Sequence, residues 1–300
     1  MSAAQQQTPI VLRGTELGQL IQNDVKDRAA RFAEKHGRKP GLVAVLVGDD
    51  PASGIYTRKK SETAGTLGLN GRVIHLPAKT DPDKVRDTIE ELNRDDAVDG
   101  ILLQRPLPDN GAGFSERNLV WWVDPLKDVD AFHPENVGLM HLGLPGLRPC
   151  TPAGVVRLLK HFKIEIAGRV ACVVGRSAIV GKPMASLLLQ ENATVLHCHS
   201  QTKPLETITT TADILVVAAG KPALINAKHV KPGAVVVDVG IHRGRDGKIC
   251  GDVDYESACT VASAITPVPG SVGPLTIAML FSNTLDAAEK RAAVILRRKT

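Results

Sequence analysis

The sequence predicts an α/β fold of two domains, and three observations carry that prediction. Short apolar runs alternate with segments of helical periodicity, as in βαβ units around a parallel sheet. The alternation is interrupted once, by a Gly- and Pro-rich stretch at 144–152, and then restarts. The 300 residues are 43% apolar and 23% charged, which suffices for two globular cores and excludes a largely disordered chain.

The first half of the chain is predicted to contain three strands, each preceded by a helix. Residues 13–36 have helical periodicity, and the run LVAVLV at 42–47 ends in the turn residues GDDP. The pattern continues with a helix over 53–68, a strand over 71–76, a helix over 82–93 and a strand over 100–104 that Pro106 and Pro108 end. These elements predict an N-terminal α/β domain over residues 1–150.

The second half is predicted to form a Rossmann-type domain over residues 151–275. A helix over 153–161 opens it, and a second helix is expected over 183–191. The predicted strands are 170–174, 194–198, 214–218 and 234–239. A long helix over 276–298 follows, and we expect it to return to the first domain.

Composition and charge exclude several classes of protein. No apolar run approaches the roughly 20 residues that span a bilayer, and the N-terminus lacks the features of a secretory signal, so a cytoplasmic location is expected. The five cysteines have no C-x-x-C spacing and indicate buried free thiols of a reducing compartment.

The net charge of +5 fits anionic ligands and nucleic acid alike. Aromatic residues, only 3% of the chain, do not interleave with the basic runs, which disfavours nucleic acid. Part of the excess lies in a C-terminal tail that we interpret as a solvated helix face. Its basic residues are Lys290, Arg291, Arg297, Arg298 and Lys299.

A candidate phosphate-binding turn, GRSAIVGKP at 175–183, lies between a predicted strand and a helix. Backbone N–H groups at a helix N-terminus favour an anion, and Gly175 and Gly181 allow close approach. The turn is not a G-x-G-x-x-G motif, so an ordinary βα turn is the alternative. Ile241 lies just after the strand predicted over 234–239, where a Rossmann cofactor usually meets the backbone.

The end of the next strand predicts the type of dinucleotide. NAD-binding domains usually place an acid there, on the ribose 2′-OH, whereas the stretch 197–202, which includes Ser200, has none. Because Arg176 adds positive charge in the preceding turn, the 2′-phosphate of NADP is favoured. His197 and His199 share a strand face, but no further cluster supports a metal, and none is expected.

Residues suited to acid–base chemistry lie in the first domain. Ser53, Tyr56 and Lys60 lie on one predicted helix, with Tyr56 and Lys60 one turn apart on the same face. Burial lowers the pKa of a lysine toward neutrality, so the pair suits proton transfer, although a solvated basic helix gives the same spacing. Short-chain dehydrogenases also contain Y-x-x-x-K, but after their nucleotide turn; here it precedes the turn by more than 100 residues.

Three further segments are candidates for the site. Gln104 lies at the carboxyl end of a predicted strand, the edge at which open α/β sheets bind ligands. Asp128 and Asp130 share a loop and would serve as metal ligands, caps or substrate anchors, a cap or a loop salt bridge being favoured for Asp128. The stretch TPVPGSVGPLT at 266–276 is either a shaped loop or a plain linker.

Together, and in this order, these segments resemble the bifunctional methylenetetrahydrofolate dehydrogenase/methenyltetrahydrofolate cyclohydrolase family. The resemblance spans nearly the whole chain and rests on the segments 47–60, 100–108, 127–130, 149–152, 175–177 and 267–276. It implies oxidation of 5,10-methylenetetrahydrofolate with NADP, hydrolysis of the methenyl product to 10-formyltetrahydrofolate, and a homodimer. The alternative is a Rossmann-type NAD(P)-dependent dehydrogenase of another small substrate.

The resemblance also implies roles for individual residues. Lys60 would be the main catalytic group, Gln104 would bond it, Tyr56 would stack on the folate, and Asp130 would accept hydrogen bonds from the pterin. Further substrate-binding residues would be Ser53, Pro269, Gly270, Gly273 and Pro274. Cofactor-binding residues would be Gly175, Arg176, Ser177, Ser200 and Ile241.

The sequence departs from the family pattern at three positions. Ser271 and Leu275 stand where the family's last loop usually has glycine and methionine, and Arg105 stands where an apolar residue is common. If position 271 requires a positive φ, its serine is expected to be strained.

Overall fold

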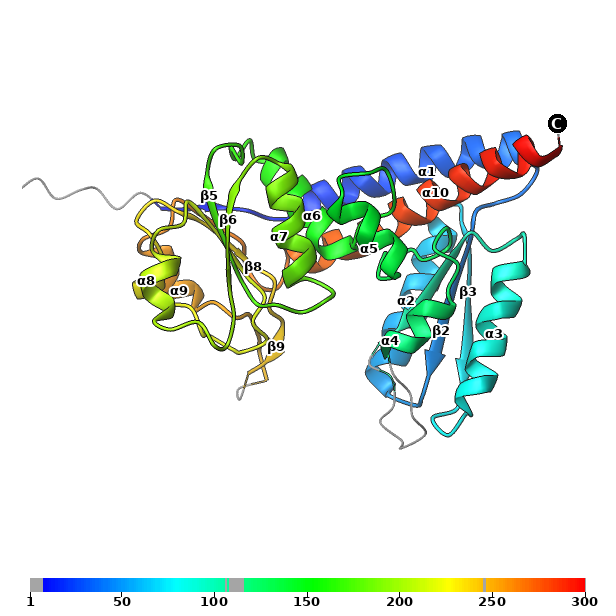
Figure 1. Cartoon of the computed structure of the whole chain (residues 1–300), viewed down its shortest axis with the longest axis horizontal. Helices are drawn as coiled ribbons and strands as arrows, with labels where there is room; N and C mark the ends of the chain where they lie inside the picture. The colour runs from blue at the N-terminus through cyan, green and yellow to red at the C-terminus, as the bar shows by residue number, and fades with distance from the viewer. Residues whose placement is uncertain (1–7, 106, 108–115, 245–246, 300) are drawn as a thin grey trace, which may run out of the picture. The chain divides into compact units, whose positions relative to one another are not determined.

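The computed structural model describes residues 8–105, 107, 116–244 and 247–299, with no account of side chains at 51–53, 55–56, 116–118 and 295–299. Its contacts divide the chain into two compact units (Figure 1). The three-stranded unit comprises residues 19–150 and 277–299; the six-stranded unit comprises 8–18 and 151–276. Pro106 and Pro108, predicted to end a strand, lie outside the described residues.

The three-stranded unit is built on a parallel sheet in the order β3-β2-β4. Its strands are β2 (Gly41–Val47), β3 (Asn70–Leu76) and β4 (Gly100–Gln104). All seven residues of the central strand β2 are buried. A strand covered on both faces has no polar side to alternate with, which explains the continuous apolar run at 42–47.

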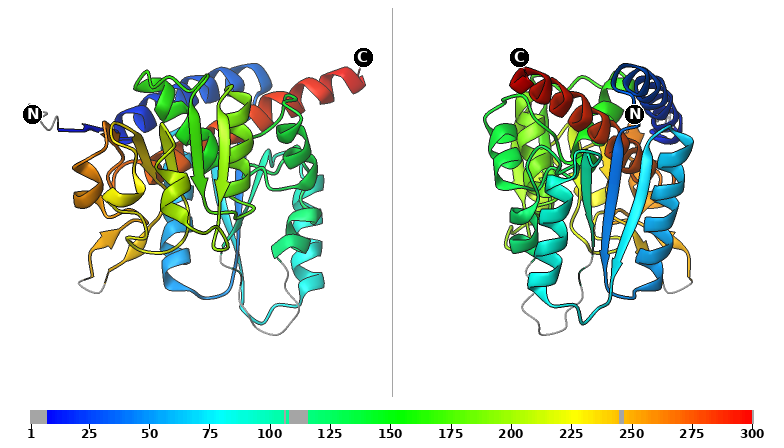
Figure 2. Two further views of the ribbon diagram at one scale, coloured as in Figure 1. Left: turned by 60° about the vertical axis from the view of Figure 1, so that its left-hand side comes forward. Right: turned by 90° about the vertical axis from the view of Figure 1, so that its right-hand side faces the viewer.

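Helices cover both faces of this sheet (Figures 1 and 2). On one face, Val43 and Val45 pack against Val85 and Ile89 of α3 and Leu119 of α4. Helix α2 contacts β2 and β3. The helices of this unit are α2 (Pro51–Thr66), α3 (Pro82–Arg94), α4 (Glu116–Trp122) and α5 (Pro134–His141), and α1 (Thr15–His36) and α10 (Val272–Lys299) run into it from the other unit.

The C-terminal helix α10 packs into the three-stranded unit, which confirms the prediction that it returns to the first domain. It lies beside α1 (Figure 1), where Arg28 bonds Asp286 and Glu289. Further along α10, Arg291 donates to the carbonyl of Val98 and the carboxylate of Asp99. The interpretation of the basic tail as a solvated face is therefore wrong for Arg291, which is 7% exposed because its charge pairs with the buried Asp99.

The six-stranded unit is built on a parallel sheet in the order β1-β11-β8-β7-β5-β6. Its strands are β1 (Ile10–Val11), β5 (Val170–Val174), β6 (Thr194–Cys198), β7 (Ile214–Val217), β8 (Val235–Asp238) and β11 (Ala264–Ile265). From β5 the chain adds β6 on one side and β7, β8 and β11 on the other. The direction of winding therefore changes between β5 and β7, the switch point at which doubly wound sheets bind ligands.

Residues 8–18 belong to the six-stranded unit, which differs from the predicted domain of 1–150. The reason is strand pairing, since Ile10 and Val11 lie in register with Ala264 and Ile265 of β11. The other elements of this unit are α6 (Cys150–His161), α7 (Gly181–Gln190), α8 (Leu205–Thr209), a 3₁₀ turn η1 (Ala227–His229), α9 (Tyr255–Cys259) and the antiparallel pair β9 (His242–Arg243) and β10 (Ile249–Cys250).

Candidate functional site

A lysine–glutamine hydrogen bond lies at the carboxyl end of β4. Lys60, two turns into α2, donates from Nζ to Oε1 of Gln104 over 3.0 Å. The amide of Gln104 in turn donates to the carbonyl of Arg105 over 2.7 Å. Gln104 is thus oriented with its oxygen toward the lysine, as the resemblance implies.

Burial lowers the pKa of Lys60 below its ordinary value, because the ammonium loses hydration. The charges of Asp130 and Cys150 act in the opposite direction but do not cancel this effect. Gln104 supplies a neutral acceptor, which holds the amine in place without restoring its charge. The surroundings therefore hold Lys60 closer to the neutral amine than free lysine, as a proton-accepting group requires.

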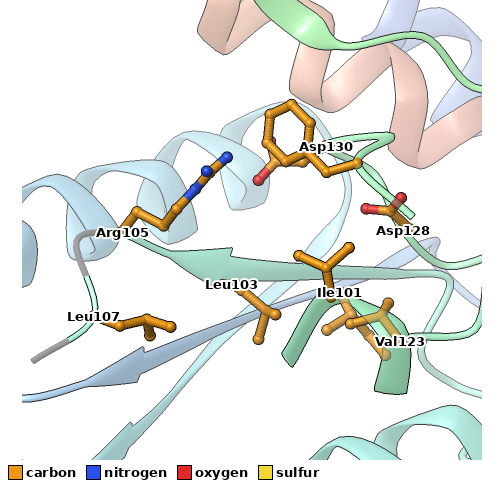
Figure 3. Close-up of a pocket in the computed structure, with 9 residues that line it drawn as sticks. Ile101, Leu103, Arg105, Leu107, Val123, Asp128 and Asp130 are labelled. Atoms are coloured by element: carbon orange, nitrogen blue, oxygen red, sulfur yellow. The ribbon is translucent and has the colours of Figure 1, made fainter. Parts of the chain in front are cut away.

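Asp130 contributes a carboxylate to a pocket beside β4 (Figure 3). Burial raises its pKa to about 6, although the nearby charges of Arg105 and Lys60 act to lower it. The guanidinium of Arg105 lies 4.4 Å from the ring centroid of Phe132. The remaining lining is mostly apolar and comprises Ile101, Leu103, Leu107, Val120, Val123 and Asp128.

Asp128 organises the loop that carries Asp130. Its Oδ2 accepts hydrogen bonds from the backbone N–H of His133 at 2.7 Å and from the Asn136 amide at 3.1 Å. This contact confirms the capping role favoured for Asp128.

Two buried residues to which the sequence assigns no role also hold this loop. Lys127, with 0% of its surface exposed, donates to the carbonyls of Leu92 and Asp95 at the end of α3. Asn283 of α10 donates to the carbonyl of Val129, between the two aspartates. Neither could be found from sequence, because both depend on contacts between segments far apart in the chain.

Ser53 and Tyr56 can be placed only by their backbone. Both lie in α2, and their side chains fall outside the described part of the structure. Tyr56 is four residues before Lys60, so the two Cβ atoms lie on the same face of the helix. The predicted roles of both residues therefore stay predictions.

The predicted phosphate-binding turn follows β5 and leads into α7. Its two glycines leave no room for a side chain. A Cβ on Gly175, whose φ is +126°, would lie 2.0 Å from the carbonyl oxygen of Ala218, and one on Gly181 2.0 Å from that of Gly175. The Ser177 hydroxyl accepts from the backbone N–H groups of Val180 and Gly181. The backbone can thus approach a ligand closely at the N-terminus of α7.

The other predicted cofactor residues lie at the same edge of the sheet. Arg176 and Ser200 are exposed in the turns after β5 and β6, and Ile241, after β8, is 61% exposed. His197 Nε2 lies 2.8 Å from the Gly175 carbonyl and so is engaged within the turn. In the described residues, no group of three His, Cys, Asp or Glu side chains is arranged to hold a metal.

The predicted substrate loop lies in the six-stranded unit and partly within α10. Gly270 has a φ of +107°, which favours glycine, whereas Gly273 and Pro274 belong to the first turn of α10 rather than to a loop. The expected strain at Ser271 is absent, since its φ is not positive. Its side chain is buried and donates from Oγ to the carbonyl of Leu12 over 2.7 Å.

Two family models match the chain and together cover most of it. The tetrahydrofolate dehydrogenase/cyclohydrolase catalytic domain matches residues 12–130. The NAD(P)-binding domain of the same enzymes matches residues 149–292. The Lys60, Gln104 and Asp130 cluster falls within the first match, and the turn after β5 within the second.

Curated relatives match over nearly their whole length. The bifunctional protein FolD of Acetivibrio thermocellus is 49% identical over 282 residues, which are 94% of this chain and 98% of the relative. The bifunctional protein FolD of Bordetella petrii is 50% identical over 282 residues, which are 94% of this chain and 95% of the relative.

Solved structures of enzymes of the same kind have the same fold as this chain. The FolD methylenetetrahydrofolate dehydrogenase/cyclohydrolase of Campylobacter jejuni has a TM-score of 0.90 at 44% identity, covering 94% of this chain and 99% of that one. The Trypanosoma brucei enzyme, complexed with NADP cofactor and an inhibitor, has a TM-score of 0.88 at 34% identity, covering 95% and 99%.

Proposed function

The chain belongs to the tetrahydrofolate dehydrogenase/cyclohydrolase family, and we infer from this that it carries out both reactions of the family. It oxidises 5,10-methylenetetrahydrofolate with NADP and hydrolyses the methenyl product to 10-formyltetrahydrofolate. The hydrolysis is supported by the hydrogen bond between Lys60 and Gln104, which lies close to Asp130. A dehydrogenase of another substrate is disfavoured, because it leaves this cluster and the match at 12–130 unexplained.

The residues at the carboxyl edge of the six-stranded sheet fit NADP. The turn at 175–181 has no room for side chains at its two glycines and opens onto the N-terminus of α7, as a diphosphate requires. Arg176 and Ser200 are exposed where the 2′-phosphate is expected, with no acid in 197–202 to repel it. When bound, NADP⁺ accepts a hydride from the substrate, a step for which the protein needs to supply only orientation.

We assign the proton transfers of hydrolysis to Lys60. A neutral amine at this position takes a proton from the attacking water as the oxygen adds to the methenyl carbon. The resulting ammonium then returns this proton to the ring nitrogen as the carbon–nitrogen bond breaks, and the hydroxyl on the same carbon releases its own proton to solvent as the formyl carbonyl forms. Gln104 holds the amine throughout, since its oxygen accepts from either protonation state.

We assign binding of the pterin to Asp130. An ionised carboxylate accepts hydrogen bonds from the amino group and ring N–H of the pterin, a pairing strengthened by its charge. Ser53, Tyr56, Pro269, Gly270, Gly273 and Pro274 are proposed as further folate-binding residues on the resemblance. Gly175, Arg176, Ser177, Ser200 and Ile241 are proposed to bind NADP.

We further propose that the protein is a cytoplasmic homodimer. The family resemblance supports the dimer, and the five free cysteines fit a reducing compartment. Light scattering on the purified protein tests the dimer. No helix in the described residues is both long and apolar enough to cross a membrane.

The dehydrogenase assignment is tested by NADPH formation. Purified protein mixed with 5,10-methylenetetrahydrofolate and NADP⁺ is expected to form NADPH, and NAD⁺ in a parallel reaction is expected to give a lower kcat/KM. Faster turnover with NAD⁺ would contradict the assignment of Arg176 and Ser200 to the 2′-phosphate.

Folate affinity is expected to fall at acidic pH. Because the pKa of Asp130 is about 6, the carboxylate is ionised above that pH and accepts the pterin N–H groups; below it, the carboxyl is protonated, and one of its oxygens becomes a donor that faces those groups. The Kd for folate substrate should rise as the pH falls through 6, by up to about tenfold per pH unit. Titration from pH 8 to 5 measures this, and a pH-independent Kd would contradict the role of Asp130.

Loss of the Tyr56 ring is expected to weaken folate binding. Tyr56→Ala should raise the folate Kd by roughly three- to tenfold, the usual worth of one ring contact, and Tyr56→Phe should restore most of the affinity. The chain has one other tyrosine, Tyr255, in the six-stranded unit, and Tyr255→Phe serves as the matched control with unchanged affinity. An unchanged Kd in Tyr56→Ala would remove Tyr56 from the site.

A further inference from the structure

The turn after β7 lies at the switch point of the six-stranded sheet. β7 is the neighbour of β5 on the side away from β6, and the Ala218 N–H donates to the carbonyl of Val174. The Ala218 carbonyl limits the space at Gly175, the first residue of the phosphate-binding turn. Residues 218–221 therefore form one wall of the edge at which we place NADP.

One buried carboxylate holds this wall. Asp252 has 0% of its surface exposed, and its Oδ2 accepts the backbone N–H groups of Ala219 at 2.6 Å and Gly220 at 2.9 Å. Its Oδ1 accepts the N–H of Lys221 at 2.9 Å and lies 2.6 Å from Nε2 of His242. A carboxylate only accepts, so Nε2 donates in this pair. Three consecutive backbone donors thus converge on one side chain.

A second carboxylate fixes Asp252 itself. Asp238, at the end of β8, accepts the backbone N–H groups of Asp252 at 3.0 Å and Gly240 at 2.8 Å. Space is tight, because a Cβ on Gly251 would lie 1.9 Å from Asp238 Oδ2 and one on Gly240 2.5 Å from the Asp252 backbone nitrogen. Asp252 therefore ties the turn after β7 to the turn after β8, which leads to Ile241 and to β9 (Figure 1).

We propose that Asp252 is a positioning residue for the cofactor, which sets the backbone of residues 219–221 beside the phosphate-binding turn through its four hydrogen bonds. The inference rests on the proposed function, since it assumes that NADP binds at this edge. Asparagine cannot replace the carboxylate, because its NH₂ group would face a backbone N–H where Asp252 presents an oxygen.

The test compares Asp252→Asn with Asp254→Asn in the full-length protein. Asp254 caps α9 by accepting the N–H of Ser257, and asparagine caps equally well, so that variant removes a nearby carboxylate without disturbing the turns. Asp252→Asn is expected to raise the Kd for NADP⁺ by about tenfold, which is the effect of losing one hydrogen bond to a charged group. Asp254→Asn should leave it unchanged.

Two further readouts separate positioning from general stability. The cyclohydrolase rate without NADP, and the KM for methylenetetrahydrofolate, should stay within about twofold of wild type in Asp252→Asn, because their residues lie in the other unit or in the 266–276 loop. A lowered Tm with an unchanged Kd for NADP⁺ would overturn the proposal, as would equal losses in both activities. Failure of the wild-type protein to bind NADP⁺ would instead overturn the proposed function.

A second variant serves if Asp252→Asn does not fold. His242→Leu removes the imidazole partner of Asp252, supplies no other donor and leaves the three backbone donors in place. It is expected to raise the Kd for NADP⁺ by about threefold, less than Asp252→Asn, because one of four bonds is lost. An unchanged Kd in a folded His242→Leu protein would overturn the proposal.

Discussion

Replacing Lys60 with methionine is expected to abolish cyclohydrolase activity. Methionine matches the aliphatic stem of lysine but has no nitrogen, so Gln104 loses its donor and the attacking water loses its base. General acid–base groups contribute roughly 10²- to 10⁴-fold in rate, and a loss of that size is expected in kcat for hydrolysis of the methenyl substrate. Lys59→Met, at the exposed neighbouring lysine, is the matched control and should retain full activity.

The same variant should remain folded. Burial lowers the pKa of Lys60, which means that the folded state disfavours its charged form. The wild-type protein therefore loses stability from this group as the pH falls below the pKa of an unfolded lysine, and methionine removes that cost. The Tm of Lys60→Met at pH 7 is expected to equal or exceed that of wild type. Normal formyltetrahydrofolate production by the folded variant would contradict the assignment of Lys60.

Replacing Asp130 with alanine is expected to abolish folate binding and to leave NADP binding intact. The substitution removes the carboxylate that accepts the pterin N–H groups and leaves those donors unpaired in a largely apolar pocket. Loss of two hydrogen bonds to a charged group should raise the folate Kd by at least about a hundredfold. Parallel titrations with substrate and with NADP⁺ measure both affinities.

The control for Asp130→Ala is an exposed carboxylate of the same region. Glu135 lies at the surface in the first turn of α5, and Glu135→Gln should change neither affinity. Equal losses of folate and NADP binding in Asp130→Ala would show that Asp130 supports the fold rather than the substrate.

The sequence predicted the long elements of both sheets because each has a strong local signal. β5 and β6 have the predicted bounds, and β2 and β3 differ by one residue. The apolar run of β2 is continuous because helices cover both faces of its sheet, so the pattern needs no knowledge of the partner strand. The helix expected over 276–298 begins four residues earlier in the structure, because Pro274, which favours a loop in sequence, is accommodated in the first turn of α10.

The elements that were missed depend on contacts between distant segments. β1 and β11 have two residues each and exist because they pair with one another across the sequence. The burial of Arg291 follows from its pairing with Asp99, 192 residues away, and Asn283 reaches Val129 across 154. Such contacts have no local pattern, so a charged helix end was interpreted as solvated.

The sequence predicts that Lys60, Gln104 and Asp130 act together, and the structure shows them as neighbours, while their roles stay predictions. Lys60, Gln104 and Asp130 came from the order of the motifs and the resemblance. The raised pKa of Asp130 arises from burial, and the four bonds of Asp252 arise from three backbone donors and the His242 ring that converge in three dimensions. Aspartates 238 and 252 have no spacing that distinguishes them from surface acids.

The central claim, that one chain performs both reactions with Lys60 needed for the second, is tested by a single time course. 5,10-Methylenetetrahydrofolate and NADP⁺ are mixed with wild type or with Lys60→Met, and NADPH, the methenyl form and 10-formyltetrahydrofolate are followed together. Wild type should form NADPH and 10-formyltetrahydrofolate, whereas Lys60→Met should form NADPH and accumulate the methenyl form. Equal conversion of the methenyl form by both proteins, or no NADPH from wild type, would contradict the account.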